Sequence, residues 1–267
     1  MSRFVRAVVR PPAETFAQGL TEAELGAPDL ALALAQHAAY CDALERAGLA
    51  LLRLPPDPAY PDSTFVEDTA ILDARAAILT RPGAPSRAGE VASIAAALRG
   101  LGVETIALPG PGHVDGGDVC DAGERCFIGL SGRTDEAGAR ALAGLLGDLG
   151  REATIVDVRP LGPALLHLKS GLSTLGEGRL VVAPALADHP AFAGHERVVV
   201  DRAEVYAANC VRVNDRVLVA AGAPRLAEAL DRRGLAVELL AMSEFQKMDG
   251  GLSCLSLRLP AGALGAA

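Results

Sequence analysis

The sequence has few aromatic residues and no tryptophan: six phenylalanines and three tyrosines make up 3% of its 267 residues. Aromatic rings are the usual stacking surfaces for bases, so binding by stacking is disfavoured. A basic patch is also missing, and with a formal net charge of -8 we expect no nucleic-acid partner. No run reaches the roughly 18 to 20 uncharged apolar residues of a membrane helix. Pro11 and Pro12 interrupt the basic N-terminus before a signal peptide forms, so we expect a cytoplasmic protein without a membrane partner.

Two kinds of motif are absent as well. The five cysteines, at positions 41, 120, 126, 210 and 254, are odd in number and scattered, with no CxxC pair. Neither a disulfide framework nor a zinc site is indicated, and most of them are expected to be reduced and structural. No GxGxxG follows the first apolar segment and there is no Walker A sequence, which argues against a nucleotide site.

What is present is a repeated order of strand, helix and strand. Alternating apolar segments flank helical periodicity, with Gly48 ending a helix over 29–47 and Ser86 placed to cap the next helix. The copies cover 4–55, 76–110, 126–158, a shortened 179–201, and 216–242. Five copies about 40 to 50 residues apart favour a single α/β domain over 1–267 built as a closed ring of repeats. An open doubly wound sheet fits the alternation alone equally well.

Acidic residues stand between the copies. "PDSTFVEDTAIL" carries Asp62, Glu67 and Asp68, and in an extended segment Glu67 and Asp68 point to opposite sides. "GHVDGGDVCD" places Asp115 and Asp118 around two glycines, which allow another group to approach the backbone closely. From spacing alone, a solvated strand edge explains the first segment as well as a site does, and a turn between strands is the more common explanation of the second.

His167 in "LLHLKSGLS" and Cys254 in "DGGLSCLSLR" each allow a structural explanation too, a hydrogen-bonded core histidine and a small core hydrophobe. Together they fit a site in which a cysteine nucleophile is served by a histidine that a carboxylate orients. Several carboxylates suit a positively charged ligand, and Arg87 and Arg133 would hold a carboxylate. A cationic amino acid such as arginine satisfies both ends.

Seven segments in order carry a more specific signal: "FVEDTAIL", "LTRPGAPSR", "HVDGGDV", "GLSGRT", "LHLKS", "YAANCVRVND" and "KMDGGLSCLSLR". Together they resemble the dimethylarginine dimethylaminohydrolases of the guanidine-modifying pentein superfamily, over nearly the whole chain. The resemblance implies a five-bladed β/α propeller with pseudo-fivefold symmetry, which also accounts for the five copies.

The resemblance further implies the roles of individual residues. Cys254 matches the nucleophile, His167 the general acid and base, and Asp115 the carboxylate beside that histidine, where some relatives carry Glu. The positions that match substrate-binding residues are Leu20, in a loop that closes over the substrate, and Asp62, Glu67, Asp68, Arg87, Arg133, Met248 and Asp249.

The implied activity is hydrolysis of Nω,Nω-dimethyl-L-arginine or Nω-methyl-L-arginine to L-citrulline and an amine, through a covalent thiouronium on Cys254. It requires no metal or organic cofactor, its partner is the small-molecule substrate, and a homodimer is an open possibility. Three alternatives remain at this stage: an arginine deiminase, although those enzymes typically carry an inserted helical module for which this chain has no room; another small guanidine or amidine hydrolase; and a non-catalytic binding or redox-sensing protein on the same scaffold.

Overall fold

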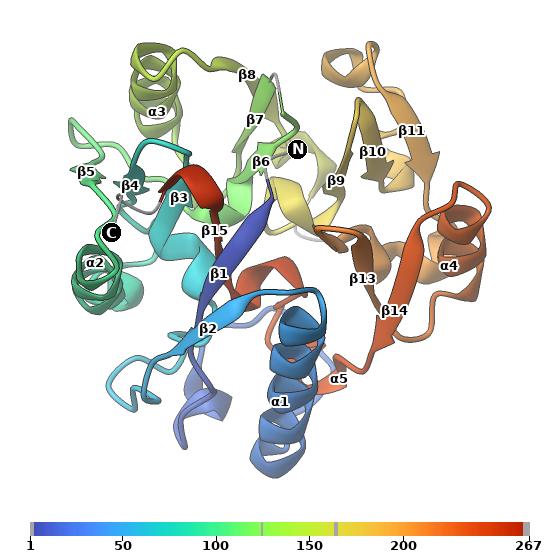
Figure 1. Cartoon of the computed structure of the whole chain (residues 1–267), viewed down its shortest axis with the longest axis horizontal. Coiled ribbons are helices and arrows are strands. Elements are labelled where there is room, and N and C mark those ends of the chain that lie inside the picture. The colour runs from blue at the N-terminus through green and yellow to red at the C-terminus, as the bar shows by residue number, and fades with distance from the viewer. Residues whose placement is uncertain (1–2, 124, 163–164, 264–267) are drawn as a thin grey trace.

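Five sheets of three strands each form a ring in the described part of the chain, as Figure 1 shows. The structure is a computed structural model and describes residues 3–123, 125–162 and 165–263. Each sheet pairs its first strand antiparallel to the second and its second strand parallel to the third. The closed ring of repeats is therefore confirmed, and the open doubly wound sheet is wrong.

The strands of the five sheets, in the order first, second and third strand, have the following bounds. They are β15 (Leu257–Pro260), β1 (Phe4–Val9) and β2 (Ala50–Arg53); β3 (Ala70–Leu72), β4 (Ala77–Leu79) and β5 (Thr105–Ala107); β6 (Val119–Asp121), β7 (Arg125–Leu130) and β8 (Glu152–Asp157); β9 (Leu172–Gly176), β10 (Arg179–Val182) and β11 (Glu196–Val199); and β12 (Val211–Val213), β13 (Arg216–Ala220) and β14 (Ala236–Leu240).

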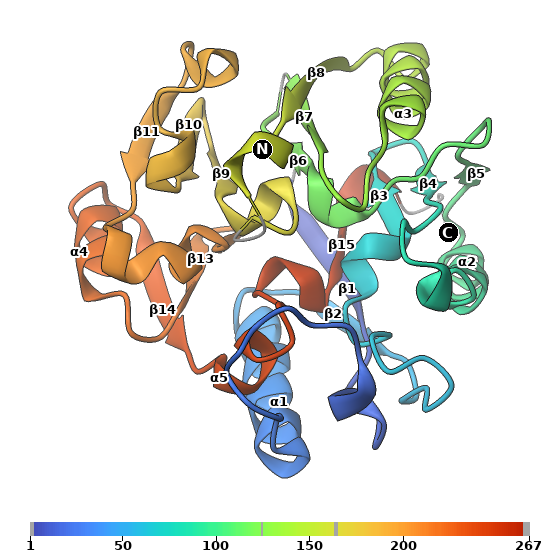
Figure 2. The same cartoon turned by 180° about the vertical axis from the view of Figure 1, so that it is seen from behind.

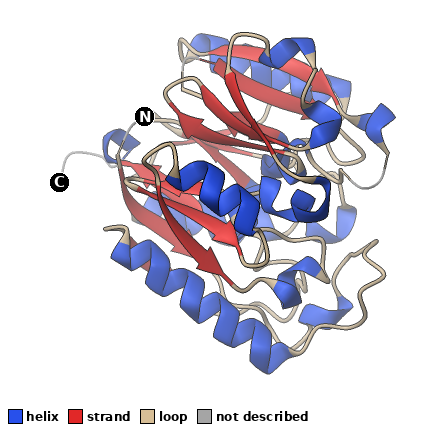
Figure 3. Cartoon of the chain, turned by 90° about the vertical axis from the view of Figure 1, so that its right-hand side faces the viewer, coloured by secondary structure: helices blue, strands red, loops and turns tan. Residues whose placement is uncertain are grey.

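Helices connect the second and third strands and cover the outer side of the sheets, as Figure 3 shows. They are α1 (Leu30–Arg46), α2 (Glu90–Gly100), α3 (Glu136–Asp148) and α4 (Pro224–Asp231). The fourth sheet has two short 3-10 turns in place of a helix, at Pro184–Leu186 and Pro190–Phe192, which confirms the shortened copy. A short helix α5 (Ser243–Gln246) follows β14. No described helix is long and apolar enough to span a membrane.

Helix ends follow the sequence signals in one case and depart from them in another. Asp29 caps α1 by accepting the Leu32 N–H at 2.9 Å, and Gly48 just beyond the helix has φ +91°, where a side chain would be strained. The prediction that Ser86 caps α2 was wrong. Ser86 lies in a 3-10 turn, and the residue before α2 is Gly89, because this turn is used to bring Arg87 inward.

The first strands of the five sheets surround the axis of the ring. A cavity of about 230 Å³ on this axis is lined by residues of β3, β6, β9, β12 and β15. Each of these strands is preceded by a 3-10 turn: Val66–Thr69, Gly116–Asp118, Leu168–Ser170, Arg202–Ala208 and Ser253–Leu255. We call these the axial turns. Neighbouring axial turns are in contact with each other: those of the first and second, second and third, third and fourth, and fourth and fifth sheets.

Candidate active site

A small cavity of about 30 Å³ lies where axial turns meet. Ten of the eleven positions that the resemblance singled out line it: Leu20, Asp62, Asp68, Arg87, Asp115, Arg133, His167, Met248, Asp249 and Cys254. These residues come from separate parts of the chain, so the ring fold brings them together. Glu67 is the predicted position that does not line this cavity.

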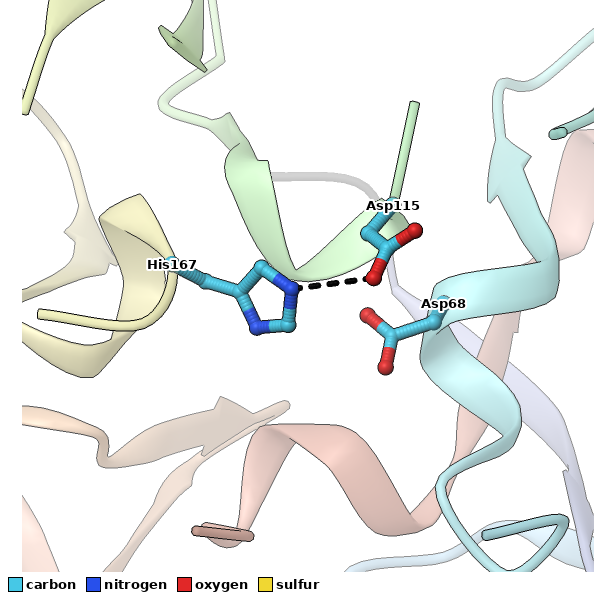
Figure 4. Close-up of side chains that lie close together, drawn as sticks. All are labelled: Asp68, Asp115 and His167. Carbon is cyan, nitrogen blue, oxygen red and sulfur yellow. Dashed lines mark hydrogen bonds and ion pairs between the residues drawn. The ribbon is translucent and has the colours of Figure 1, made fainter. Parts of the chain in front are cut away.

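Figure 4 shows His167 facing two carboxylates, Asp115 and Asp68. The His167 Nε2 lies 3.1 Å from Asp115 Oδ2, and all three side chains are buried. Burial lowers the pKa of His167, but the negative charges of Asp68 and Asp118 and the hydrogen bond with Asp115 outweigh it and raise the pKa to about 9. The imidazole is therefore protonated near neutral pH and can donate a proton.

Gly117 makes this closeness possible. A Cβ there would lie 2.7 Å from His167 Nδ1 and 2.9 Å from Asp68 Oδ1, so a side chain would push the two apart. The Gly117 N–H also donates to Asp68 Oδ1 at 2.8 Å. The second glycine of "HVDGGD" is thus explained by close approach, as the sequence suggested.

Asp68 and Arg87 form a buried ion pair with an Nη1 to Oδ2 distance of 2.5 Å. Glu90, which sequence reasoning missed, accepts from Arg87 Nε at 3.0 Å and from Nη2 at 2.8 Å. The Phe65 carbonyl accepts from Nη2 as well, so four of the five N–H groups of Arg87 are engaged. Burial raises the pKa of Asp68, but the charges of Arg87 and His167 outweigh it and lower the pKa to about 2.

Arg133 is the second arginine at the cavity. Among the hydrogen bonds of the described residues, its guanidinium has no partner, and the residue is partly exposed. It therefore has more capacity to bind a ligand carboxylate than Arg87, whose donors already serve Asp68 and Glu90.

Cys254 lies in the axial turn Ser253–Leu255 and is partly exposed, whereas the other four cysteines are buried. Burial, together with the negative charges of Glu67 and Asp68, raises the pKa of Cys254 to about 12. The sulfur is a thiol in this state. Gly250 and Gly251 precede it because side chains there would overlap the Phe65 ring and the Asn209 side chain.

Glu67 lies behind Cys254 in a closed ring of hydrogen bonds. Its carboxylate accepts from Lys169 Nζ at 2.6 Å and from Ser253 Oγ at 2.6 Å. Asn209 completes the ring, because its Nδ2 donates to the Lys169 carbonyl at 2.9 Å and its Oδ1 accepts the Ser253 N–H at 2.9 Å. The ring joins the turn that follows His167 to the turn that carries Cys254, and Glu67 faces away from the small cavity.

The sequence predicts an extended segment around Glu67. The structure corrects this, because the segment forms the 3-10 turn Val66–Thr69. Its two carboxylates nevertheless diverge, with Asp68 on Arg87 and Glu67 on Lys169. The turn differs from a strand because Thr69 donates its hydroxyl to the Val66 carbonyl at 2.7 Å, which closes the backbone locally.

One kind of hydrogen bond, from a backbone N–H to a side-chain oxygen, recurs between the axial turns. Asp68 accepts the N–H of Gly117, Asp118 accepts the N–H of Leu168 at 2.8 Å, and Asn209 accepts the N–H of Ser253. At each of these three junctions a side-chain oxygen at the end of one turn holds the backbone of the next. The site is thereby held by repeated contacts between sheets.

The loop from β1 to α1 lies over the site, as Figure 2 shows from the opposite side of the ring. The Leu20 N–H donates to Asp62 at 3.1 and 3.2 Å. Asp249, with φ +54°, accepts from the Thr21 hydroxyl at 3.1 Å and from the Glu22 N–H at 2.6 Å. These bonds hold the loop closed over the cavity.

The ligand atoms of Asp68, Asp115 and His167 lie within 4.8 Å of one another, which is near enough to hold a metal ion. Both carboxylates already accept from protein donors, however: Asp68 from Arg87 and Gly117, and Asp115 from Gly83 at 2.8 Å. Their charge is further balanced by a protonated His167. The arrangement suits proton transfer better than metal binding.

The chain matches no model of a known protein family. Among curated proteins, it is 40% identical over 256 residues to the N(G),N(G)-dimethylarginine dimethylaminohydrolase of Pseudomonas aeruginosa, covering 96% of this chain and 99% of that one. It is 36% identical over 255 residues to the protein of that name from Streptomyces coelicolor, with 95% and 96% covered. A solved structure of the Pseudomonas enzyme, a mutant complexed with citrulline, superposes with a TM-score of 0.92 at 39% identity, covering 96% and 100% of the two chains.

Proposed function

The chain belongs to the dimethylarginine dimethylaminohydrolase family, and we propose that Cys254, His167 and Asp115 carry out its reaction. The enzyme hydrolyses Nω,Nω-dimethyl-L-arginine to L-citrulline and dimethylamine, and Nω-methyl-L-arginine to L-citrulline and methylamine. The observation that carries the assignment of residues is the convergence of ten predicted positions on one cavity.

The substrate is positioned by charge. Its guanidinium lies against Asp68, which stays ionised because the pKa of its carboxyl is about 2. Arg133, whose guanidinium is not engaged among the described residues, binds the α-carboxylate, and Asp62 receives the α-ammonium together with the Leu20 backbone. Arg87 acts mainly on Asp68, because four of its donors are already used.

The first half of the reaction forms the covalent intermediate. The bound guanidinium stabilises the thiolate of Cys254, whose proton is released, and the sulfur attacks the guanidinium carbon to give a tetrahedral adduct. His167, protonated because its pKa is about 9, donates its proton to the substituted nitrogen. The carbon–nitrogen bond breaks, the amine leaves, and a thiouronium remains on Cys254.

The second half uses the same histidine as a base. His167, now neutral, takes a proton from water while the water oxygen attacks the thiouronium carbon. The adduct gives up its hydroxyl proton to solvent as the carbon–sulfur bond breaks, which releases citrulline and returns the thiolate. Asp115 holds the imidazole through its bond to Nε2 in both halves.

Glu67 and Asn209 act as positioning residues. Their closed ring with Lys169 and Ser253 fixes the turn of Cys254 relative to the turn of His167. The negative charge of Glu67 also raises the pKa of Cys254. The geometry thus supports a role for Glu67 beneath the nucleophile rather than direct contact with the substrate.

The loop that carries Leu20 opens for substrate entry. A cavity of about 30 Å³ is far smaller than the roughly 300–1,000 Å³ of pockets that bind whole small molecules, so it does not admit an arginine as it stands. Leu20, Thr21 and Glu22 therefore release Asp62 and Asp249 before binding and engage them again afterwards.

We further propose that the whole chain acts as one domain, because turns from several sheets contribute to the site. All five cysteines are free, which supports a location in the reducing cytoplasm. The chemistry above uses no metal or organic cofactor. A homodimer stays a prediction that sedimentation equilibrium tests.

The deciding experiment measures citrulline release from Nω,Nω-dimethylarginine, Nω-methylarginine and arginine in parallel, with Cys254→Ser as the control. Turnover of both methylated substrates that is lost in the variant supports the reaction and the nucleophile. Turnover of arginine alone indicates a deiminase. Activity that persists in Cys254→Ser contradicts the assignment of the nucleophile.

A further inference from the structure

A second, larger cavity of about 410 Å³ adjoins the small one. The two share Leu166, His167, Asp249, Gly250 and Cys254, so they meet at the reacting sulfur and the imidazole. The larger volume lies within the range of roughly 300–1,000 Å³ in which proteins bind whole small molecules. It is therefore part of the reaction space.

Its other walls differ in character from those of the small cavity. Leu25, Leu165, Val205 and the ring of Tyr206 form an apolar part of its wall, and the rest is mixed, with the polar side chains of Glu22, Lys169, Ser170, Asn209 and Gln246. The small cavity is more highly charged, since it carries Asp62, Asp68, Arg87, Asp115 and Arg133. Leu25 is 53% exposed and Val205 is 44% exposed, so two large apolar side chains face solvent at this cavity. Exposed apolar surface beside a catalytic group fits an apolar part of a ligand.

The charges fix which part of the substrate enters which cavity. The amino-acid end is drawn to the small cavity by Asp62 and Arg133, and the guanidinium carbon lies at the sulfur of Cys254. The nitrogen that leaves must reach His167, which lines both cavities. Its substituents then project from the small, highly charged cavity into the large one, toward the apolar part of its wall.

The large cavity exceeds what the methyl groups require. Dimethylamine has only three non-hydrogen atoms, whereas a cavity of about 410 Å³ is of the size that holds a whole small molecule. Leu25, Leu165, Val205 and the ring of Tyr206 give part of its wall an apolar character. This space and this part of the wall suit alkyl and arylalkyl groups longer than methyl.

We propose that this enzyme hydrolyses Nω-alkyl-L-arginines whose substituent is larger than methyl, such as propyl or benzyl, with the large cavity as the leaving-group pocket. The reaction is balanced as in the methyl case: one water is consumed, the carbon–nitrogen bond to the substituted nitrogen breaks, and citrulline and the primary amine are released. This inference rests on the proposed function.

The first test offers Nω-propyl-L-arginine and Nω-benzyl-L-arginine to the full chain and measures citrulline and the released propylamine or benzylamine together, beside Nω,Nω-dimethylarginine. Equimolar amine and citrulline that disappear in Cys254→Ser support the proposal. If dimethylarginine is turned over while neither larger substrate is hydrolysed, the assignment of the large cavity as a leaving-group pocket is refuted. If dimethylarginine is not turned over either, the proposed function itself has failed.

The second test narrows the pocket with Val205→Trp. The matched control is Val199→Trp on β11, a valine of similar exposure, 51%, that does not line either cavity. One methylene more or less in a hydrophobic pocket is worth roughly 10–200-fold in kcat/KM. We expect Val205→Trp to reduce kcat/KM for the propyl and benzyl substrates at least about tenfold more than for Nω-methylarginine, and Val199→Trp to leave the ratio unchanged. An equal effect of Val205→Trp on all substrates would overturn the proposal.

Discussion

Replacing Asn209 by Ala tests whether the closed ring of hydrogen bonds positions the nucleophile. Asn209 does not line the small cavity in which the substrate's amino-acid end is proposed to bind, although it borders the large cavity. Its side chain joins the Lys169 carbonyl to the Ser253 N–H, one residue before Cys254, so kinetics are measured with Nω-methylarginine, whose leaving group is the smallest. The alanine variant cuts this link. The Cys254 turn then remains connected to the His167 turn through Glu67 alone.

The expected magnitude follows from the groups left behind. The Lys169 carbonyl loses its donor and the Ser253 N–H loses its acceptor, and a buried polar group without a partner costs about 1–3 kcal/mol. The two groups together lower the free energy of unfolding by about 2–4 kcal/mol, allowing for partial relaxation. A shift of the sulfur by about 1 Å from its attacking position lowers kcat by about 100-fold, whereas the charges that bind the substrate are untouched.

Asn214→Ala is the matched control. Asn214 also makes three side-chain hydrogen bonds, to both backbone groups of Phe4 and to the Ala47 carbonyl, but does not line either cavity. Denaturant unfolding and steady-state kinetics are measured for both variants. We expect both to lose stability and Asn209→Ala alone to lose kcat with little change in KM. If Asn209→Ala keeps its kcat, or if both variants lose it equally, the positioning role is refuted.

Three further predictions concern the charges and the close approach at the site. Burial lowers the pKa of His167, but nearby negative charges, of which Asp68 contributes most, raise the pKa to about 9. Activity that needs the imidazolium is therefore lost as the pH rises through about 9. Asp68→Asn should move this alkaline limb of kcat to lower pH, and a limb that does not move contradicts the electrostatic argument. The pKa of about 12 for Cys254 should fall when the cationic amino acid L-lysine binds, as read from the ultraviolet absorbance of the thiolate; an unchanged titration rules out ligand-assisted ionisation. Gly117→Ala should lower kcat/KM by about tenfold or more, equivalent to ~1.4 kcal/mol, because its Cβ would meet His167 Nδ1 at 2.7 Å, whereas Gly132→Ala, with nothing within 4 Å, should be neutral.

The five copies could be predicted because the helices and most of the second and third strands are long enough to show periodicity, and the short β4 and β5 flank a helix that does. Three of the first strands could not, since β3, β6 and β12 have three residues each, alternation needs about four or more, and no α-helix of the described residues adjoins them. These are the strands that surround the axis and follow the axial turns. A usable signal was present nevertheless, a polar residue one or two positions before each of these strands: Asp68 two before β3, Asp118 one before β6, and Asn209 two before β12.

The candidate site came from the resemblance, because spacing alone left His167 and Cys254 open to structural explanations. Even the resemblance assigned Glu67 to the substrate, whereas its carboxylate is engaged by Lys169, Ser253 and Arg258. Such partners lie far away along the chain, and side-chain direction within a 3-10 turn is decided by contacts that no local pattern encodes. For the same reason Asn209 and Glu90 were missed.

The pairing of β1 with β15 has a consequence for how the molecule is made. The strand directly after the nucleophile turn hydrogen-bonds to the first strand of the chain, with Val8 opposite Leu257. On the ribosome the ring therefore stays open until β15 has emerged. A nascent chain that has not yet reached Ser253 lacks both the closing strand and the sulfur, so the nucleophile and the closure of the ring become available almost together.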